Sequence, residues 1–574
     1  MRIFKKDLLL GLLAMVLLLG TRAIVAPHRG ADDAQLDLSP ENCTVIMVAK
    51  GASTDGSTMT THTADCGTCD WTWGHFPAVD HKPGETRKIY HINQYKTWPP
   101  KEGLKWELYK KDYAGLDIPE VPHTYAYHHG MFGYMNENQV AISESTIGTV
   151  RKLVNNTPAA KIDLTMLSLL GMERSKTARE CVKTMGTLAE KYGYGFNDDG
   201  EMFAVSDPNE VWVFEIMPVG PLWTPEGGKP GAVWCAQRLP DDNVSVCPNE
   251  SRIGEIDLND ADHFLASPNV VSCAVENGLY DPKSGRAFNW KRAYSPAEGS
   301  AVSTGGRRAR LWRYLDAVAP SLKLSAGTPS MDLPFSVKPD KKISLQDVMN
   351  LTRDKCYGTQ FDPVRGIRGG PFANPNIYAM TRTIGTNRAE YTSLVQCRSG
   401  LPDPIGGIAW LSFGAQDTAC YMPLYAGMTD VPKSFTIGDH FEFNRGSARW
   451  AFDYVDFHAQ VVYSEAIEDI KKALVEYEAG AIARIPEIDK QAQDLYAKNK
   501  AKAAEFLTKF SIDNANKVVN AWWELGDRLL VKYNHFGFYD PSNRQKERGK
   551  PSYSDTWRKA VRIVDVISEQ EPQR

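Results

Sequence analysis

The stretch that most limits how this chain can fold runs from Cys43 to Asp65. The run "TVIMVA", directly after Cys43, is apolar and rich in β-branched residues, which predicts a strand buried on both faces. The next residues, "KGASTDGS", supply turn chemistry, and "TMTTHTAD" then alternates small polar residues with a few apolar ones. The stretch is therefore predicted to be a β-hairpin whose return strand carries His62 and Asp65.

The centre of the turn decides which residue lies opposite Cys43. A turn centred on Thr54 places Asp65 there. A turn centred one residue earlier places His62 or Thr63 there instead. In both registers His62 and Asp65 come close to the cysteine.

The first 26 residues have the composition of a targeting segment. Basic residues at the start precede the apolar run Leu8–Gly20, which is short for a membrane span. We expect a signal peptide over residues 1–26, with an uncleaved signal anchor as the alternative, followed by a polar, exposed spacer over residues 27–42. The protein is then predicted to be secreted, periplasmic or lumenal, and associated with a membrane only if the signal stays attached.

The overall composition argues against some classes of function. The chain has 66 Lys and Arg against 70 Asp and Glu, and this balance gives no electrostatic reason to expect nucleic-acid binding. "HTYAYHHG" (His123–Gly130) contains three histidines, but the spacing of HExxH or of paired CxxC motifs is missing. We therefore expect neither a metal nor an organic cofactor.

Ten cysteines suit an exported chain in which disulfides can form. The sequence "CGTC" (Cys66–Cys69) has the spacing of a redox pair, but no βαβ pattern follows it. A disulfide or two structural cysteines is the expectation at this place.

The rest of the chain predicts a mixture of strands and helices. We expect a turn and strand in Gly133–Thr146, a strand in Glu210–Val219, a short helix in Asn269–Pro282 and a pair of apolar strands in Gly406–Gly427. From Ser464 onward the apolar residues follow helical spacing. These patterns predict one large α+β domain over residues 43–463, with a helical extension over residues 464–574 packed on it.

The hairpin and several later stretches resemble the cysteine dipeptidase family of N-terminal nucleophile (Ntn) hydrolases, to which secernins are related. The family pattern of Cys-Thr, then Ala-Ser/Thr-x-Asp-Gly-Ser, then an Asp on the return strand is matched by Cys43-Thr44, "ASTDGST" and Asp65. Later blocks occur in the family's order: "MNENQVAIS", "SDPNEVWVFEI", "GAVWCAQRLPD", "YGTQFDPVRGIRGGPFANP" and "LPDPIGGIAWLSFGAQDTACYMPLYAG". Many members have Arg where this chain has His62, which leaves open whether His62 takes over that catalytic role, belongs to a variant substrate site or is a structural histidine.

The resemblance implies an αββα four-layer sandwich and the hydrolysis of dipeptides through a thioester on Cys43. In such enzymes the first residue of the mature chain supplies the nucleophile, and its own α-amine acts as the base. An isolated α-amine titrates near about pH 7.7–8.0, so much of it is deprotonated at neutral pH. An autocatalytic cut between Asn42 and Cys43 is then expected, and residues 27–42 would be a propeptide.

The resemblance also suggests the remaining catalytic residues. Related Ntn amidases have a side-chain amide after the strand that corresponds to "VWCAQRLP", and Asn249 is the candidate for stabilising the oxyanion. Arg310 is the candidate for the arginine that those enzymes carry after the middle of the chain, and Asp65 for orienting the α-ammonium. Asn249 also lies in an Asn-x-Ser sequon, so a glycosylated or plain loop asparagine is the alternative.

A dipeptide carries an ammonium and a carboxylate about one peptide unit apart, so its pocket needs an acid and a cation. Glu144 and Arg368 are the candidates for these substrate-binding roles. Small peptides are therefore the expected partners, and a homo-oligomer is compatible with the sequence. Two alternatives stay open: another Ntn amide hydrolase, such as an acylase, and a non-catalytic, secernin-like interaction protein that never exposes Cys43.

Overall fold

The computed structural model describes residues 43–66, 69–91, 112–130, 134–154, 159–195, 199–296, 305–377, 382–438, 440–536 and 553–561. The predicted targeting segment, the propeptide and Asn42 of the processing site lie outside these ranges, and the predicted domain boundaries stay predictions. Residues Asp37–Arg574 group into one compact unit, apart from Met1–Leu36. Among the described ranges, no helix combines the length and the apolar character that crossing a membrane would need.

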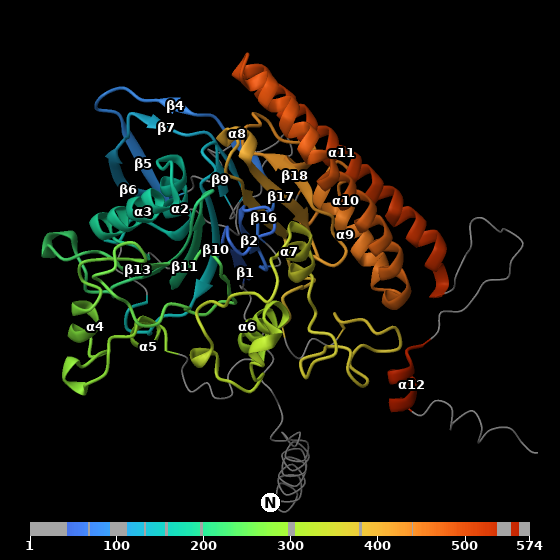
Figure 1. Cartoon of the computed structure of the whole chain (residues 1–574), viewed down its shortest axis with the longest axis horizontal. Coiled ribbons are helices and arrows are strands. Elements are labelled where there is room, and N and C mark those ends of the chain that lie inside the picture. The colour runs from blue at the N-terminus through green and yellow to red at the C-terminus, as the bar shows by residue number, and fades with distance from the viewer. Residues whose placement is uncertain are drawn as a thin grey trace, which may run out of the picture. The chain divides into compact units, whose positions relative to one another are not determined.

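Two large antiparallel sheets form the centre of the unit (Figure 1). The first has the order β14-β1-β2-β16-β17-β18, from β1 (Val45–Val48), β2 (Thr58–Thr63), β14 (Val244–Cys247), β16 (Tyr391–Cys397), β17 (Gly407–Phe413) and β18 (Met422–Tyr425). The second has the order β15-β13-β12-β11-β10-β9-β8-β3, from β3 (Gly74–Phe76), β8 (Tyr127–His129), β9 (Tyr134–Asn136), β10 (Ala141–Ile147), β11 (Gly200–Ser206), β12 (Val211–Met217), β13 (Val233–Arg238) and β15 (Phe264–Ala266). Strands β10 and β11 lie against β2, so the two sheets are stacked.

Two small sheets pair β4 (Val79–Asp80) with β7 (His123–Thr124), and β5 (Thr86–His91) with β6 (Asp112–Pro119). The remaining short helices are α4 (Ser272–Glu276), α5 (Trp290–Tyr294), α8 (Asp403–Gly406) and α12 (Asp555–Val561). The predicted elements outside the hairpin are confirmed as β10, β12, α4 and the strand pair of β17 and β18.

Helices cover the outer side of each sheet. Helices α2 (Leu164–Glu173) and α3 (Ala178–Tyr192) pack on the second sheet, and α6 (Gly305–Val318) packs beside β14 of the first. The long helices α10 (Tyr463–Tyr496) and α11 (Lys500–Tyr533) run side by side with α9 (Ala448–Ala459) over β17 and β18 (Figure 1). Helix α7 (Leu345–Thr352) packs into the apolar core that α10 and α11 also line. This order of helix, sheet, sheet and helix is the αββα sandwich, so the predicted fold class is confirmed.

Strand β1 is apolar because both of its faces are covered. Val45 and Met47 belong to the core that includes β11, β12 and β13 of the second sheet. Ile46 and Val48 belong to the core formed with helices α6, α7, α10 and α11. A strand in this position needs apolar side chains at every residue, which the run "VIMV" provides.

The register of the hairpin lies between the two predicted ones. Met47 is paired with Thr60, and continuing this register places Ala64 opposite Cys43. The turn is therefore centred between Ser53 and Thr54, and not on either of these residues. Gly56 has φ = 76° in this turn, a conformation that side chains with a Cβ rarely adopt.

Strand β2 is polar but fully buried, and the threonines on one of its faces bond to the second sheet or to the residue that follows β11. The Thr58 hydroxyl donates to the carbonyl oxygen of Asp207 at 2.7 Å, and the Thr60 and Ser143 hydroxyls are hydrogen-bonded at 3.0 Å. Buried polar groups require such partners. The polar side of the return strand therefore faces a polar interior between the sheets.

One carboxyl group in helix α9 makes stability depend on pH. Partial burial and the charge of Asp417 raise the pKa of Asp456 from 3.8 to about 6. The folded protein then holds this proton more tightly than the unfolded chain, so the wild type loses stability as pH rises through this window. We expect Asp456→Asn, which can still accept from the Thr418 hydroxyl, to lack this loss.

The measurement is the thermal midpoint of both proteins between pH 3.5 and 7. The midpoint of Asp456→Asn should rise relative to that of the wild type as pH passes from 3.8 to about 6. A difference that stays constant with pH would show that Asp456 does not cause the effect.

Candidate active site

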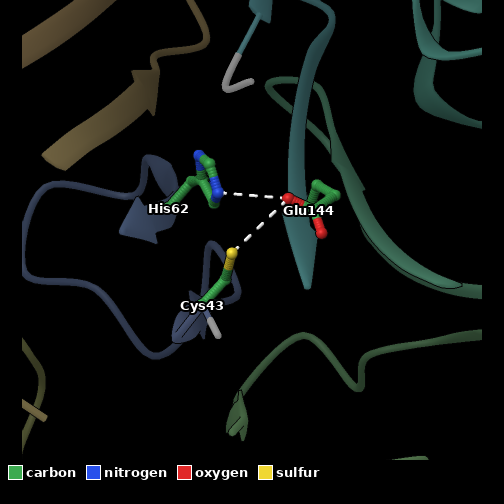
Figure 2. A group of neighbouring side chains, drawn as sticks. All are labelled: Cys43, His62 and Glu144. Carbon is green, nitrogen blue, oxygen red and sulfur yellow. Dashed lines mark hydrogen bonds and ion pairs between the residues drawn. The ribbon is translucent and has the colours of Figure 1, made fainter. Parts of the chain in front are cut away.

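Three buried side chains meet just before the start of β1 (Figure 2). Cys43 immediately precedes Thr44 and β1, His62 lies on β2, and Glu144 lies on β10. The Cys43 thiol donates to Glu144 Oε2 at 3.6 Å, and His62 Nε2 lies 3.2 Å from the same oxygen. The sulfur, the imidazole nitrogen and the carboxylate oxygen all lie within 4.8 Å of one another.

Neighbouring groups hold the Glu144 carboxylate in its ionised form. Its second oxygen accepts from the Thr146 hydroxyl at 3.2 Å. Burial opposes ionisation, but the hydrogen bond and the charge of His62 outweigh it and lower the pKa of Glu144. The site therefore presents a carboxylate to the Cys43 sulfur.

The thiol itself is held protonated in the unprocessed chain. Burial raises the pKa of Cys43 well above its usual range, and the negative charges of Glu144, Asp65 and Glu201 raise it further. Arg382 acts in the opposite direction, with a smaller effect. A thiolate would need an additional positive charge beside the sulfur.

Asp65 lies next to this group and is paired with an arginine that the sequence did not predict. Its carboxylate forms an ion pair with Arg382 and accepts from the Thr63 hydroxyl at 3.0 Å. Burial raises the pKa of Asp65, and the Arg382 charge limits the rise. Arg382 lies 317 residues further along the chain, so no local pattern connects the two.

Arg310 bonds to the backbone of Cys43 and to the side chain of Asn249. Arg310, from α6, is fully buried and donates to the Cys43 carbonyl oxygen and to the Thr44 hydroxyl, both at 2.8 Å. It also donates to Asn249 Oδ1 at 3.1 and 3.2 Å. The structure thus brings Arg310 to the cysteine and Asn249 to Arg310, although each came only from resemblance.

The side chain of Asn249 is fixed at both ends. Its Nδ2 donates to the Thr146 carbonyl oxygen at 3.0 Å and to the Ser145 hydroxyl at 3.2 Å. The residue is 1% exposed and has φ = 65°, a left-handed conformation that asparagine tolerates better than most residues. This burial argues against the glycosylated alternative, and the catalytic role of Asn249 stays a prediction.

Arg368 is the predicted residue that the structure does not bring to this group. It is half-buried in the turns between α7 and β16. Within the described ranges, no hydrogen bond or ion pair connects Arg368 with Cys43 or Glu144. Its substrate-binding role stays a prediction.

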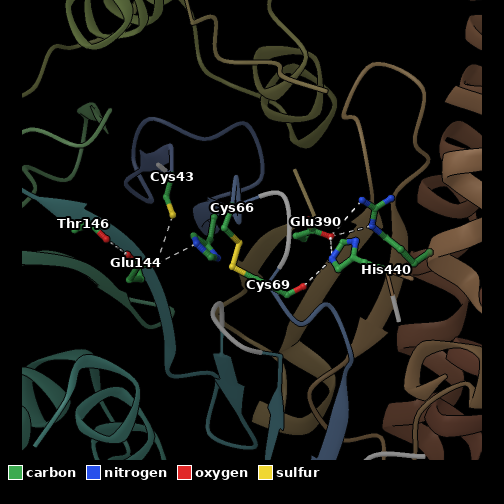
Figure 3. Close-up of a disulfide and its surroundings, with 9 residues drawn as sticks. Cys43, Cys66, Cys69, Glu144, Thr146, Glu390 and His440 are labelled. Atoms are coloured by element: carbon green, nitrogen blue, oxygen red, sulfur yellow. Dashed lines mark hydrogen bonds and ion pairs between the residues drawn. A yellow bond between two sulfur atoms is a disulfide. The ribbon is translucent and has the colours of Figure 1, made fainter. Parts of the chain in front are cut away.

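A disulfide lies directly after Asp65 (Figure 3). It joins Cys66 to Cys69, which confirms the expected disulfide. On its far side, His440 Nε2 lies 3.2 Å from the Cys69 carbonyl oxygen and 3.2 Å from Glu390 Oε2. The segment that follows Asp65 is therefore fixed to α9 as well, because Glu390 is also paired with Arg449.

A sequence model of peptidase family C69 matches residues 42–476. The chain belongs to this family. The match begins one residue before Cys43 and covers all the residues of the site described above. The C69 peptidase is thus a cysteine-type peptidase of the Ntn hydrolase class, as the resemblance implied.

Relatives of the C69 peptidase carry consistent names. A probable dipeptidase of Latilactobacillus sakei is 28% identical over 515 residues, which is 85% of this chain and 95% of that protein. A probable dipeptidase of Salmonella dublin is 26% identical over 392 residues, 67% of this chain and 81% of that protein. Among solved structures, the penicillin V acylase of Agrobacterium tumefaciens aligns with 67% of this chain and 86% of its own, at 9% identity and a TM-score of 0.25, values too low to support an argument.

Proposed function

We propose that this C69 peptidase is an exported dipeptidase whose nucleophile is Cys43, exposed as the first residue of the mature chain. The observation that carries the proposal is the buried Cys43 thiol at the start of β1, 3.6 Å from the Glu144 carboxylate. The dipeptidase names of the two relatives support the substrate class. The basic and apolar leader supports export.

A cut between Asn42 and Cys43 would convert an amide nitrogen into an amine. The free α-amine would take the proton of the thiol and, as an ammonium, supply the positive charge that the buried sulfur lacks. Asp65, fixed by Arg382, would orient this ammonium. The same residue would then be both nucleophile and base.

Hydrolysis would proceed in two steps. The thiolate attacks the peptide carbonyl, a thioester forms with the first amino acid, and the leaving amine takes the proton from the α-ammonium. A water molecule, deprotonated by the α-amine, then cleaves the thioester and restores the thiol. Asn249 stays the candidate oxyanion donor, although its Nδ2 would first have to exchange one of its two protein acceptors.

Glu144 is the candidate for binding the substrate's ammonium group. Losing a hydrogen bond to a charged group costs about 1.5–3 kcal/mol, so we expect Glu144→Gln to raise KM for free dipeptides by about 10–100-fold. The wild type should hydrolyse a dipeptide and not its N-acetylated form. Kinetics on both substrates, with Glu190→Gln on α3 as the control carboxyl variant, check this expectation.

An unchanged KM in Glu144→Gln would remove Glu144 from substrate binding. Equal turnover of the N-acetylated dipeptide would favour the acylase alternative, because an acylase does not need a free ammonium. The defining test of the proposal is the N-terminus of the mature protein, determined by sequencing and intact mass. A chain that begins at Cys43 supports the proposal, and one that keeps residues before Cys43 favours the interaction-protein alternative.

A further inference from the structure

The group of Cys43, His62 and Glu144 has the ligand chemistry of a metal site. A thiol sulfur, an imidazole nitrogen and a carboxylate oxygen are the three donor types that Zn²⁺ accepts in proteins. Within the ranges that the structure describes, no other group of three or more such side chains is close enough to hold a metal ion. His62 lies on β2, Glu144 on β10 and Cys43 two residues before β1, so their spacing is set by the fold.

The distances suit a tetrahedral ion. Zinc bonds of about 2.0–2.3 Å require ligand atoms that lie about 3.2–3.7 Å apart in a tetrahedron. His62 Nε2 and Glu144 Oε2 are 3.2 Å apart, and Cys43 Sγ and Glu144 Oε2 are 3.6 Å apart. The third pair lies within 4.8 Å, so a small movement of one side chain would complete the geometry.

The electrostatic surroundings favour a cation. Asp65 and Glu201 add negative charge near the Cys43 thiol, and the opposing charge of Arg382 has a smaller effect there. The hydrogen bond from Thr146 to the second oxygen of Glu144 leaves the first oxygen directed at the sulfur. Outer partners of this kind orient a metal-binding carboxylate.

We propose that Zn²⁺ binds to Cys43, His62 and Glu144 and inhibits the enzyme reversibly. Binding replaces the thiol proton and the proton that a charged His62 carries: the sulfur becomes a thiolate bound to zinc, the imidazole binds as a neutral ligand, and both protons are released to solvent. Three protein ligands leave a fourth position. In the mature chain the α-amine of Cys43 would fill it, because its nitrogen and sulfur can close a five-membered chelate ring.

The inhibition rests on the proposed function, but the metal binding does not. A zinc-bound sulfur is a weaker nucleophile toward a carbonyl, and a zinc-bound Glu144 cannot receive the substrate's ammonium. Zinc should therefore compete with dipeptides. The ion would act as an inhibitor in this site and not as a cofactor, which revises the expectation that the chain binds no metal.

Titration of the purified mature protein with Co²⁺, a spectroscopic substitute for Zn²⁺, tests the site without an activity assay. We expect one bound ion per chain, with a thiolate-to-cobalt charge-transfer band that Zn²⁺ abolishes. His62→Gln should weaken binding by at least about 10–100-fold, the loss seen even for outer partners of a metal site. Cys43→Ala should remove the charge-transfer band.

Two control variants keep the result specific. His263→Gln changes an exposed histidine whose ring bonds to Asp260, and the variant should bind Co²⁺ as the wild type does. The double variant Cys66→Ser/Cys69→Ser removes the neighbouring disulfide, and with it any thiols that its reduction would release, and should keep the band. A band that persists in Cys43→Ala, or an affinity that His62→Gln leaves unchanged in a folded protein, would overturn the proposal.

The outcome is separable from that of the proposed function. A protein that binds Co²⁺ through Cys43 but hydrolyses no dipeptide supports the metal site and contradicts the dipeptidase. Hydrolysis that Zn²⁺ does not inhibit, in a protein without the cobalt band, contradicts only the metal site. Circular dichroism of each variant establishes that it is folded before it is titrated.

Discussion

Cys43→Ala is expected to leave residues 27–42 on the chain and to reduce dipeptide hydrolysis by at least about 1,000-fold, since removal of a nucleophile eliminates the covalent route. Alanine has neither the thiol that would cut the Asn42–Cys43 bond nor the nucleophile for the substrate. Intact mass, N-terminal sequencing and dipeptide kinetics on the same preparation check both effects.

Cys181→Ala is the matched control for this experiment. Cys181 is also a fully buried free thiol, but it lies on α3 on the outer side of the second sheet. Its replacement should leave processing and turnover unchanged. Normal processing of Cys43→Ala would mean that another protease makes the cut, and normal hydrolysis by it would contradict Cys43 as the nucleophile.

Arg382→Met is expected to have the second large effect, because it leaves Asp65 buried without its ion-pair partner. Removing one member of a buried pair costs about 3–5 kcal/mol of unfolding free energy. Asp65 would also lose the contact that fixes its position beside Cys43, and we expect kcat to fall by about 100-fold, the effect of a small misplacement in a catalytic group. Urea denaturation and kinetics measure the two losses separately.

Arg398→Met separates these losses from each other. Arg398 is paired with Asp489 of α10, in a similarly buried environment away from the cysteine. The Arg398→Met variant should lose about as much unfolding free energy as Arg382→Met and keep its turnover per folded molecule. A similar fall in kcat for both variants would show that Arg382 acts only through the stability of the fold.

The hairpin could be predicted because its information is local. The apolar run of β1, the turn residues around Gly56 and the polar return strand lie within one short segment. Even so, the register was left open, since symmetry about the turn cannot distinguish a centre on a residue from one between two residues. The structure decided between them through the pairing of Met47 with Thr60.

The residues at the centre of the site could be predicted only where a family motif, or the charge of the expected substrate, pointed to them. Cys43 and Asp65 belong to the family pattern, and Glu144 was chosen because a dipeptide's ammonium needs an acid. The sequence did not indicate that Glu144 would contact the cysteine itself. That contact depends on how β10 lies against β2, which is a property of the stacked sheets and not of either strand.

Arg382 and Glu201 were missed for the same physical reason. Each acts through charge at short range from a position far along the chain, and no spacing rule connects an ion pair across 317 residues. Arg368 shows the opposite error. It was a plausible cation by chemistry, but the turns after α7 do not bring it to the cluster.

The strand order of the first sheet also has a consequence for timing during synthesis. β1 lies between β14, which ends at Cys247, and β2, which in turn needs β16, which ends at Cys397. Cys43 thus leaves the ribosome long before β14 and β16 are synthesised. The interval before β16 is on the order of tens of seconds at about 5–20 residues per second. Self-cleavage that needs these strands would be delayed until both sheets have formed. The appearance of the shortened chain would then report when folding is complete.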